Sequence, residues 1–292
     1  MRSSVLLTVC ASFALATTTT LAQNSTYLAI GDSVGFGITT TASYTQTSNG
    51  DRGYVSLYAD YLATQNSGIR PAVVNASIYG DSTSSYFDTS NTARALNTNY
   101  TSTISQNTFV MNAITQAAAA SRPVTTVTVS LGANDLLSII QQPGFAGLPA
   151  PTQFALLQGA FGGIVTNLTA FYTGLRTALP TANIIAVGYY DPFAILPGNP
   201  NPALTAGVIQ QLNETIRNIS QAVGARFVDT YTPFLGNEAT LTNMLLDPSI
   251  VPNVHPTGAG YSVIANQIIP APGAGALVLL STLAITRRRR VA

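Results

Sequence analysis

The sequence predicts an α/β fold in which helices cover both faces of a five-stranded parallel sheet. Short runs of β-branched and other apolar residues alternate along the chain with longer segments whose apolar residues recur every three to four positions. Strands that alternate with helices pair in parallel, because a parallel connection needs a long crossover. Without its two unusual ends the chain has roughly 245 residues, which is enough for one large domain with a substantial core.

The first strand is expected at Tyr27 to Ile30, an apolar run that stops abruptly at Gly31 and Ser33. Glycines at 31 and 35 allow a tight turn, which exposes the serine hydroxyl at the carboxyl edge of the sheet, where open α/β sheets bind ligands. We interpret Ser33 as a nucleophile. The segment also fits the G-x-S-x-G elbow of α/β-hydrolases. That elbow follows several strands, whereas this serine follows the first, so its position argues for a different hydrolase fold.

The other elements are predicted in chain order from the same two periodicities. Further strands are expected over residues 71–75, 124–130, 183–187 and 226–229. Helices are expected over residues 54–62, 107–120, 157–175 and 204–223. A last helix is expected to run to residue 268 after Thr257, because threonine caps helix N-termini. Residues 34–49 and 188–202 are interpreted as loops, the second on the substrate side.

Four loops at predicted strand ends carry, in chain order, a serine, a glycine, an asparagine and a histidine: Ser33, Gly80, Asn134 and His255. A serine hydroxyl is a poor nucleophile until a base removes its proton. His255 is the only histidine in the chain, so it is the only candidate imidazole for that task.

These four loops resemble blocks I, II, III and V of the SGNH hydrolases, also called the GDSL esterase and lipase family. The matching segments are Gly31-Asp32-Ser33, Asn75-Ala76-Ser77-Ile78-Tyr79-Gly80-Asp81, Gly132-Ala133-Asn134-Asp135 and Val254-His255-Pro256-Thr257. The resemblance spans residues 27–268. It implies a three-layer α/β/α (flavodoxin-like) fold and hydrolysis of carboxylic esters through an acyl-enzyme.

The resemblance also implies a role for each matching residue. Ser33 is the expected nucleophile and His255 the expected base. The main-chain N–H groups of Ser33 and Gly80 and the side-chain amide of Asn134 are expected to form an oxyanion hole, whose donors are each worth roughly 10²–10³ in rate. Glycine is expected at position 80 because the backbone must approach closely there. Asp32 and Asp135 also lie in these blocks, and we expect their side chains only to form hydrogen bonds with the backbone of the loops.

One position departs from the family's pattern. The family has an aspartate three residues before the histidine, where it orients the imidazole, and this chain has Pro252 there. A main-chain carbonyl, Asn253 or Asp247 remain as candidates to orient His255, with Asp247 the candidate acid. We favour the carbonyl, which makes a Ser-His dyad. Loss of the triad aspartate in another fold lowers turnover by about 10⁴, so weak activity is compatible with the sequence.

Both ends of the chain have the composition of sorting signals. Residues 1–22 combine one arginine, an apolar stretch and Thr20-Leu21-Ala22, which is typical of a secretory signal cleaved near Ala22. The only cysteine, Cys10, lies within it, so no disulfide is expected in the mature chain. Residues 270–292 resemble the PEP-CTERM signals of bacterial surface proteins. They hold a proline motif, an apolar stretch and four consecutive arginines.

These ends predict where the protein works. We expect one hydrolase domain over residues 23–269, exported by a bacterium and then secreted or held at the cell surface. Contact with a membrane is expected only through the C-terminal segment before processing, and the domain is expected to be a monomer.

The composition argues against several other classes of protein. All twelve basic residues are arginines, and five of them lie in the two ends, which leaves the domain with a net charge near −4. A nucleic-acid partner is not expected, because phosphate binding needs clustered cations. A chain without lysine has no P-loop, and one histidine with no mature cysteine does not make a catalytic zinc site. We expect neither a cofactor nor a metal.

The sequence therefore leaves two kinds of function to compare. The first is a secreted serine esterase that acts on a small-molecule or polysaccharide ester, with short acyl or acetyl groups preferred over long chains. A polysaccharide acetylesterase and a lipase or lysophospholipase are alternatives within that kind. The second is a non-catalytic cell-surface binding protein on the same fold, which the missing aspartate permits.

Overall fold

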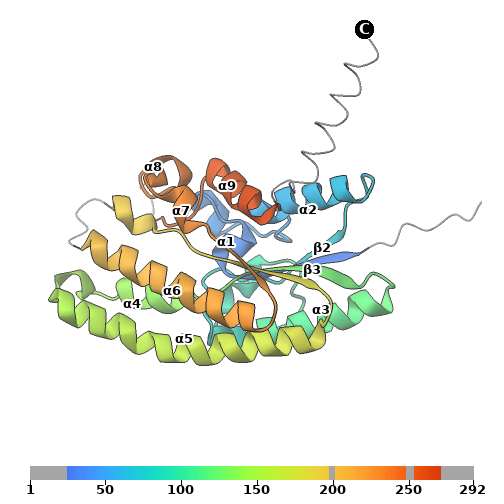
Figure 1. Cartoon of the computed structure of the whole chain (residues 1–292), viewed down its shortest axis with the longest axis horizontal. Helices are drawn as coiled ribbons and strands as arrows, with labels where there is room; N and C mark the ends of the chain where they lie inside the picture. The colour runs from blue at the N-terminus through green and yellow to red at the C-terminus, as the bar shows by residue number, and fades with distance from the viewer. Residues whose placement is uncertain (1–24, 197–200, 248–252, 271–292) are drawn as a thin grey trace, which may run out of the picture.

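A computed structural model of the chain describes residues 25–196, 201–247 and 253–270 (Figure 1). The segment expected to be a secretory signal (residues 1–22), the expected sorting segment after Pro270, and Pro252 lie outside these ranges.

The centre of the domain is a five-stranded, wholly parallel sheet with strand order β2-β1-β3-β4-β5. Its strands are β1 (Thr26–Gly31), β2 (Ala72–Asn75), β3 (Val124–Ser130), β4 (Asn183–Val187) and β5 (Arg226–Val228). This is the flavodoxin-like order, which reverses direction beside β1 and leaves a crevice at the carboxyl ends of β1 and β3. The predicted fold class and all five predicted strands are confirmed.

Helices cover both faces of the sheet (Figure 1). One layer contains α1 (Ser33–Phe36), α2 (Gly53–Gln65) and α9 (Gly258–Ile268), and the other contains α3 (Gln106–Ala119), α4 (Ala133–Ile140), α5 (Ala150–Ala178) and α6 (Pro202–Ala222). The short helices α7 (Tyr231–Phe234) and α8 (Glu238–Leu241) precede α9. Each layer packs its own apolar cluster against the sheet, so the sheet separates two cores.

The predicted long helices are confirmed, and Thr257 caps α9 by accepting a hydrogen bond from the N–H of Gly260. Short elements were missed. Helix α1 has 4 residues and α4 has 8, and both begin directly after a strand end. The region expected to be a loop after β4 contains a 3₁₀ helix, Pro192–Ile195. Elements of one or two turns show no apolar period, because a period needs several turns to repeat.

Helix α5 is the only helix in the described ranges that is long and apolar enough to cross a membrane, with a mean hydropathy of 1.4. Its inward face, which includes Leu157, Ile164 and Leu168, belongs to the core beneath the sheet. Its outward face carries exposed Phe154 and Val165.

Candidate active site

The four residues expected at strand ends surround one cavity at the carboxyl edge of the sheet. The cavity has a volume of about 310 Å³, and Ser33, Gly80, Asn134 and His255 all line it. They come from the ends of β1, β2 and β3 and from the segment before α9. The topology therefore brings together residues that are more than 200 positions apart in the sequence.

Ser33 is the first residue of α1, and its neighbour Asp32 caps that helix. The Asp32 carboxylate accepts hydrogen bonds from the N–H of Val34 at 2.9 Å and from the hydroxyl of Tyr189 at 2.7 Å. Both partners are buried, and burial raises the pKa of the Asp32 carboxyl to about 7. Asp32 thus fixes the turn that presents Ser33. We expected its carboxylate to bond only loop backbone, but it bonds one backbone N–H and one side-chain hydroxyl.

The turn around Ser33 leaves no room for side chains on its glycines. A β-carbon at Gly31 would lie 2.2 Å from the carbonyl oxygen of Ser130, and one at Gly35 would lie 2.5 Å from the hydroxyl of Ser77. Gly31 also has a φ of +150°, which residues with a β-carbon rarely adopt. Helix α1 therefore sits directly on the strand ends, and these close contacts fix the position of Ser33.

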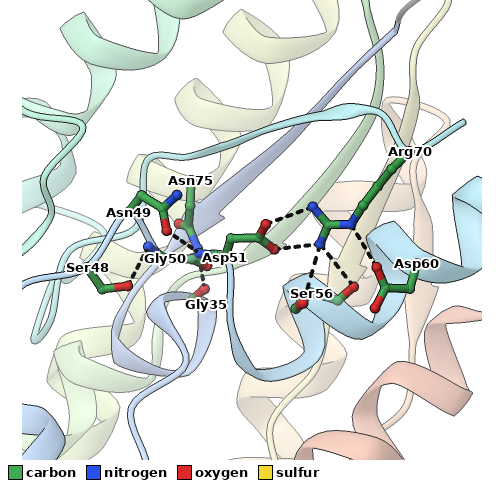
Figure 2. A network of polar contacts seen from close by, with 9 residues as sticks. All are labelled: Gly35, Ser48, Asn49, Gly50, Asp51, Ser56, Asp60, Arg70 and Asn75. Carbon is green, nitrogen blue, oxygen red and sulfur yellow. Dashed lines mark hydrogen bonds and ion pairs between the residues drawn. The ribbon is translucent and has the colours of Figure 1, made fainter.

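Asn75, at the end of β2, ties this helix to the next loop. Its side-chain amide donates hydrogen bonds of 2.8 Å to the carbonyl oxygens of both Gly35 and Gly50, as Figure 2 shows. The loop that contains Gly50 is held in turn by Arg70, whose guanidinium forms a paired contact with Asp51 and a further ion pair with Asp60 (Figure 2). Helix α1 and the loop that contains Gly50 are thereby anchored to β2 and α2.

Two backbone donors beside Ser33 are free to receive a ligand. Among the described residues no hydrogen bond engages the N–H of Ser33 or the N–H of Gly80. Asn134 lies next to them, and one N–H of its side-chain amide is bonded to the carbonyl of Asp81 at 2.9 Å, which fixes the amide and leaves its second N–H available. These three donors have the composition of an oxyanion hole.

The reason for glycine at position 80 differs from the one expected. A β-carbon at Gly80 would meet no atom of the protein within 4 Å, so close packing does not require glycine there. Its φ is +75°, in the left-handed region, and glycine adopts that conformation at no steric cost. This conformation, rather than lack of space, explains the glycine.

His255 is 3% exposed, and its Nδ1 atom has two partners. It lies 3.0 Å from the side-chain oxygen of Asn253 and 2.5 Å from the hydroxyl of Tyr44. The Nε2 atom has no partner among the described residues, so no hydrogen bond joins it to Ser33 in this structure. Such bonds are often long in unliganded enzymes and tighten with substrate. Burial lowers the pKa of His255 to about 3, which keeps the ring neutral.

Asn253 presents its oxygen to His255 because other groups bind its nitrogen. The Nδ2 atom donates to the main-chain oxygen of Thr39 at 3.2 Å and to the carboxylate of Asp247 at 3.3 Å. Asp247 in turn accepts hydrogen bonds from the N–H and the hydroxyl of Thr41 at 2.6 and 2.7 Å. The expected main-chain carbonyl is therefore not the group at Nδ1. Asp247, the candidate acid, touches Asn253 rather than the imidazole.

Three residues of the site were missed because no sequence pattern marks them. Tyr44 sits in a polar segment, and Tyr189 follows β4 in a segment interpreted only as a loop. Gln106 bonds both the N–H and the carbonyl of Gly31 at 2.9 Å and the carboxylate of Asp81 at 2.6 Å. Their positions depend on contacts across the fold, which a sequence period does not record.

Comparison with known families agrees with this arrangement. The model of the GDSL-like lipase/acylhydrolase family matches residues 29–263. The chain belongs to this family. It is an enzyme that hydrolyses ester bonds.

Solved structures of GDSL-like and related hydrolases share the fold at low sequence identity. A lipase from a goat rumen metagenome has a TM-score of 0.57 and 17% identity, with 84% of this chain and 96% of that chain covered. An acetylxylan esterase from Geobacillus stearothermophilus has a TM-score of 0.53 and 18% identity, with 85% and 94% covered. An extracellular lipase from Streptomyces rimosus has a TM-score of 0.56 and 19% identity, with 82% and 95% covered. No curated protein matches the sequence.

Proposed function

We propose that this GDSL-like hydrolase cleaves carboxylic esters through an acyl-enzyme on Ser33, with His255 as the base. One observation carries the proposal: the serine hydroxyl, two unengaged backbone N–H groups, the Asn134 amide and the unpartnered Nε2 of His255 belong to the same cavity. This combination supplies a nucleophile, a proton acceptor and a site for the negative charge.

In the proposed reaction the Oγ atom of Ser33 attacks the ester carbonyl carbon while its proton passes to Nε2 of His255. The carbonyl oxygen becomes an oxyanion that accepts hydrogen bonds from the N–H groups of Ser33 and Gly80 and from Asn134. The intermediate collapses, the C–O bond to the alcohol breaks, and His255 returns the proton to the leaving oxygen. Water then attacks the acyl-enzyme by the same steps and releases the carboxylic acid.

His255 performs this task without a carboxylate on its Nδ1. The amide oxygen of Asn253 can only accept, so its contact with Nδ1 favours a proton on that atom and a free lone pair on Nε2. The Tyr44 hydroxyl donates to the same amide oxygen at 3.1 Å, which leaves its own oxygen to accept from Nδ1–H. When His255 takes up a proton, no carboxylate at Nδ1 stabilises the positive charge of the imidazolium, and burial disfavours that charge. We therefore expect slower turnover than in a full triad.

Substitution of the two residues singly and together tests the shared proton transfer. Ser33→Ala and His255→Ala are each expected to lower turnover of p-nitrophenyl esters by several orders of magnitude, and the double variant is expected to be no slower than the slower single one. Losses that multiply in the double variant, or parental turnover in either single one, would contradict the proposal.

We also propose that the enzyme is exported, as the composition of residues 1–22 and 270–292 suggests. A chain that lacks residues 271–292 keeps every residue assigned above, so it is expected to be soluble and as active as the full chain. Loss of activity in a folded truncated protein would mean that this segment is part of the enzyme rather than an address.

A further inference from the structure

The cavity extends well beyond the four reactive residues. Its far wall is built from apolar side chains of α4, α5, α6 and the 3₁₀ helix after β4: Leu136, Leu137, Ile140, Leu157, Phe193, Val208 and Ile209. We call this part of the cavity the apolar chamber. Leu136, Leu157 and Val208 are at most 2% exposed, so the chamber reaches into the core.

Polar and apolar groups are segregated within the cavity. The ionisable residues that line it, Asp32, His255 and the tyrosines, gather around Ser33, and Asp32 is already bonded to Tyr189 and Val34. No charged side chain of the described residues lines the chamber itself. Three uncharged polar residues of α4 and α6 or their ends also line the cavity, Ser138, Gln141 and Thr205, but the first two are exposed and the Thr205 hydroxyl already donates to Asp191. A sugar ring against the buried apolar wall would leave most of its hydroxyl groups without partners, at a cost of about 1–3 kcal/mol each. A hydrocarbon chain has no polar group to leave unpaired against this wall, and its transfer out of water is favourable.

The chamber and the leaving-group side lie at opposite ends of the cavity, one towards each helical layer. His255 precedes α9, in the layer of α1 and α2, and the nearest rings to it are Tyr44 and Tyr79, with centroids 5.0 and 6.0 Å away. The chamber is formed by the opposite layer. Because His255 must hand its proton to the leaving oxygen, the alcohol lies on the Tyr44 and Tyr79 side. The acyl group then points the other way.

We infer that the apolar chamber holds the acyl chain, and that the enzyme acts on esters of medium-chain fatty acids of about six to eight carbons. The length follows from the volume. One water takes up about 30 Å³ of liquid, and a methylene group is close to water in size, so the whole cavity of about 310 Å³ has room for about ten heavy atoms. The carbonyl oxygen and the leaving oxygen beside Ser33 take two of these places, and the acyl carbons take the others. The inference rests on the proposed function and replaces the short acyl group expected from the sequence with a longer one.

The chain-length profile of p-nitrophenyl esters tests the inference. We expect kcat/KM to rise about three- to fourfold per methylene from acetate to about octanoate, as expected for methylenes leaving water, and to fall again beyond about twelve carbons, when the chamber is full. A profile that is highest at acetate, or flat, overturns the inference. If the profile is highest at acetate or flat but hydrolysis still depends on Ser33, only the inference about chain length fails and the proposed function stands. If no ester is hydrolysed, the inference and the proposed function both fail.

Two filling variants, which add side-chain volume to the chamber, test whether the chamber sets the acyl chain length that the enzyme prefers. Val208→Phe on α6 and Ile140→Phe on α4 place added volume on two different walls, and Ile140 is only half-buried, which makes it the safer variant for folding. Each is expected to lower the ratio of octanoate to acetate turnover at least tenfold. The matched control is Val165→Phe on the outward face of α5, which does not line the cavity and is expected to keep the parental ratio. Equal ratios in folded filling variants and control overturn the assignment.

Discussion

Asn253 stands where the imidazole of a triad meets a carboxylate. Replacing a triad aspartate by asparagine in another fold lowers turnover by about 10⁴, because the amide stabilises the wrong tautomer. Here Thr39 and Asp247 bind the amide nitrogen, so the oxygen faces His255 and the correct tautomer is retained. An amide at Nδ1 is thus compatible with the correct tautomer in this chain, because the carboxylate of Asp247 orients it.

The residue scale gives a first prediction for Asn253→Asp combined with Asp247→Asn. The second change keeps an amide donor beside position 253, so that the new carboxylate does not face another one. A carboxylate about 3 Å from Nδ1 is expected to raise the low pKa of His255 by about 1–3 units and to increase kcat on activated esters. The acid limb of the profile of kcat/KM against pH should move upward by the same interval. Asn253→Leu, which removes the oxygen, is the opposite control and is expected to lower kcat by roughly 10². An unchanged acid limb in the folded double variant, compared with Asp247→Asn alone, would mean that the group at position 253 does not act on His255.

A second prediction concerns Asp247. Because it contacts Asn253 and not the imidazole, Asp247→Asn is expected to lower kcat only about tenfold, with KM unchanged. If Asp247 were the acid of the triad, the loss would approach 10⁴. Measurement of kcat and KM on the folded variant distinguishes the two roles. A loss of several orders of magnitude would make Asp247 the orienting acid in its own right.

At the scale of elements, α1 depends on Asn75. Asn75→Ala would leave the buried carbonyls of Gly35 and Gly50 without a donor, at about 1–3 kcal/mol each. We expect the free energy of unfolding to fall by roughly 3 kcal/mol and ester turnover to fall as well, since α1 carries Ser33. Urea denaturation with parallel activity assays checks both. Asn112→Ala, on the exposed face of α3, is the control, and equal stability of the two variants would contradict the anchoring role.

The helices and strands also show how much of the structure could be predicted from the sequence. Strands and long helices were predictable, because β-branched runs such as residues 124–130 and stripes such as those of α5 and α6 are repeated signals. The residues at strand ends were predictable because parallel strands present their carboxyl ends on one edge. Helices α1 and α4 and the contacts of Tyr44, Gln106 and Asp247 were not, because they arise only when distant segments meet.

At the scale of the whole molecule, several buried carboxyl groups affect how stability depends on pH. Burial raises the pKa of Asp32 to about 7 and raises the pKa values of Asp81, Asp135 and Asp191. Between about pH 4 and pH 7 the folded protein holds the Asp32 proton and the unfolded chain does not, so this contribution to stability is lost as the pH rises. His255 acts in the opposite direction, since its lowered pKa costs stability as the pH falls below about 6.5.

Asp32→Asn isolates the part of this dependence that comes from Asp32. We expect the variant to lose less free energy of unfolding than the parent between pH 5 and pH 8, with a difference on the order of 3 kcal/mol. Urea denaturation at several pH values measures it. Glu214→Gln, an exposed acid on α6, is the control and should follow the parent. Parallel profiles for parent and Asp32→Asn would mean that Asp32 does not hold its proton in this range.

Labelling with an active-site-directed phosphonate tests the central claim, a serine activated by a carboxylate-free histidine, most directly. Only a working nucleophile with an oxyanion hole forms the covalent adduct. Mass spectrometry of the full chain is expected to find one adduct per molecule, on the peptide that contains Ser33. Labelling should be absent in Ser33→Ala and at least about 10²-fold slower in His255→Ala. Absence of an adduct on Ser33 in the folded parent, or labelling that is equally fast without His255, would contradict the account.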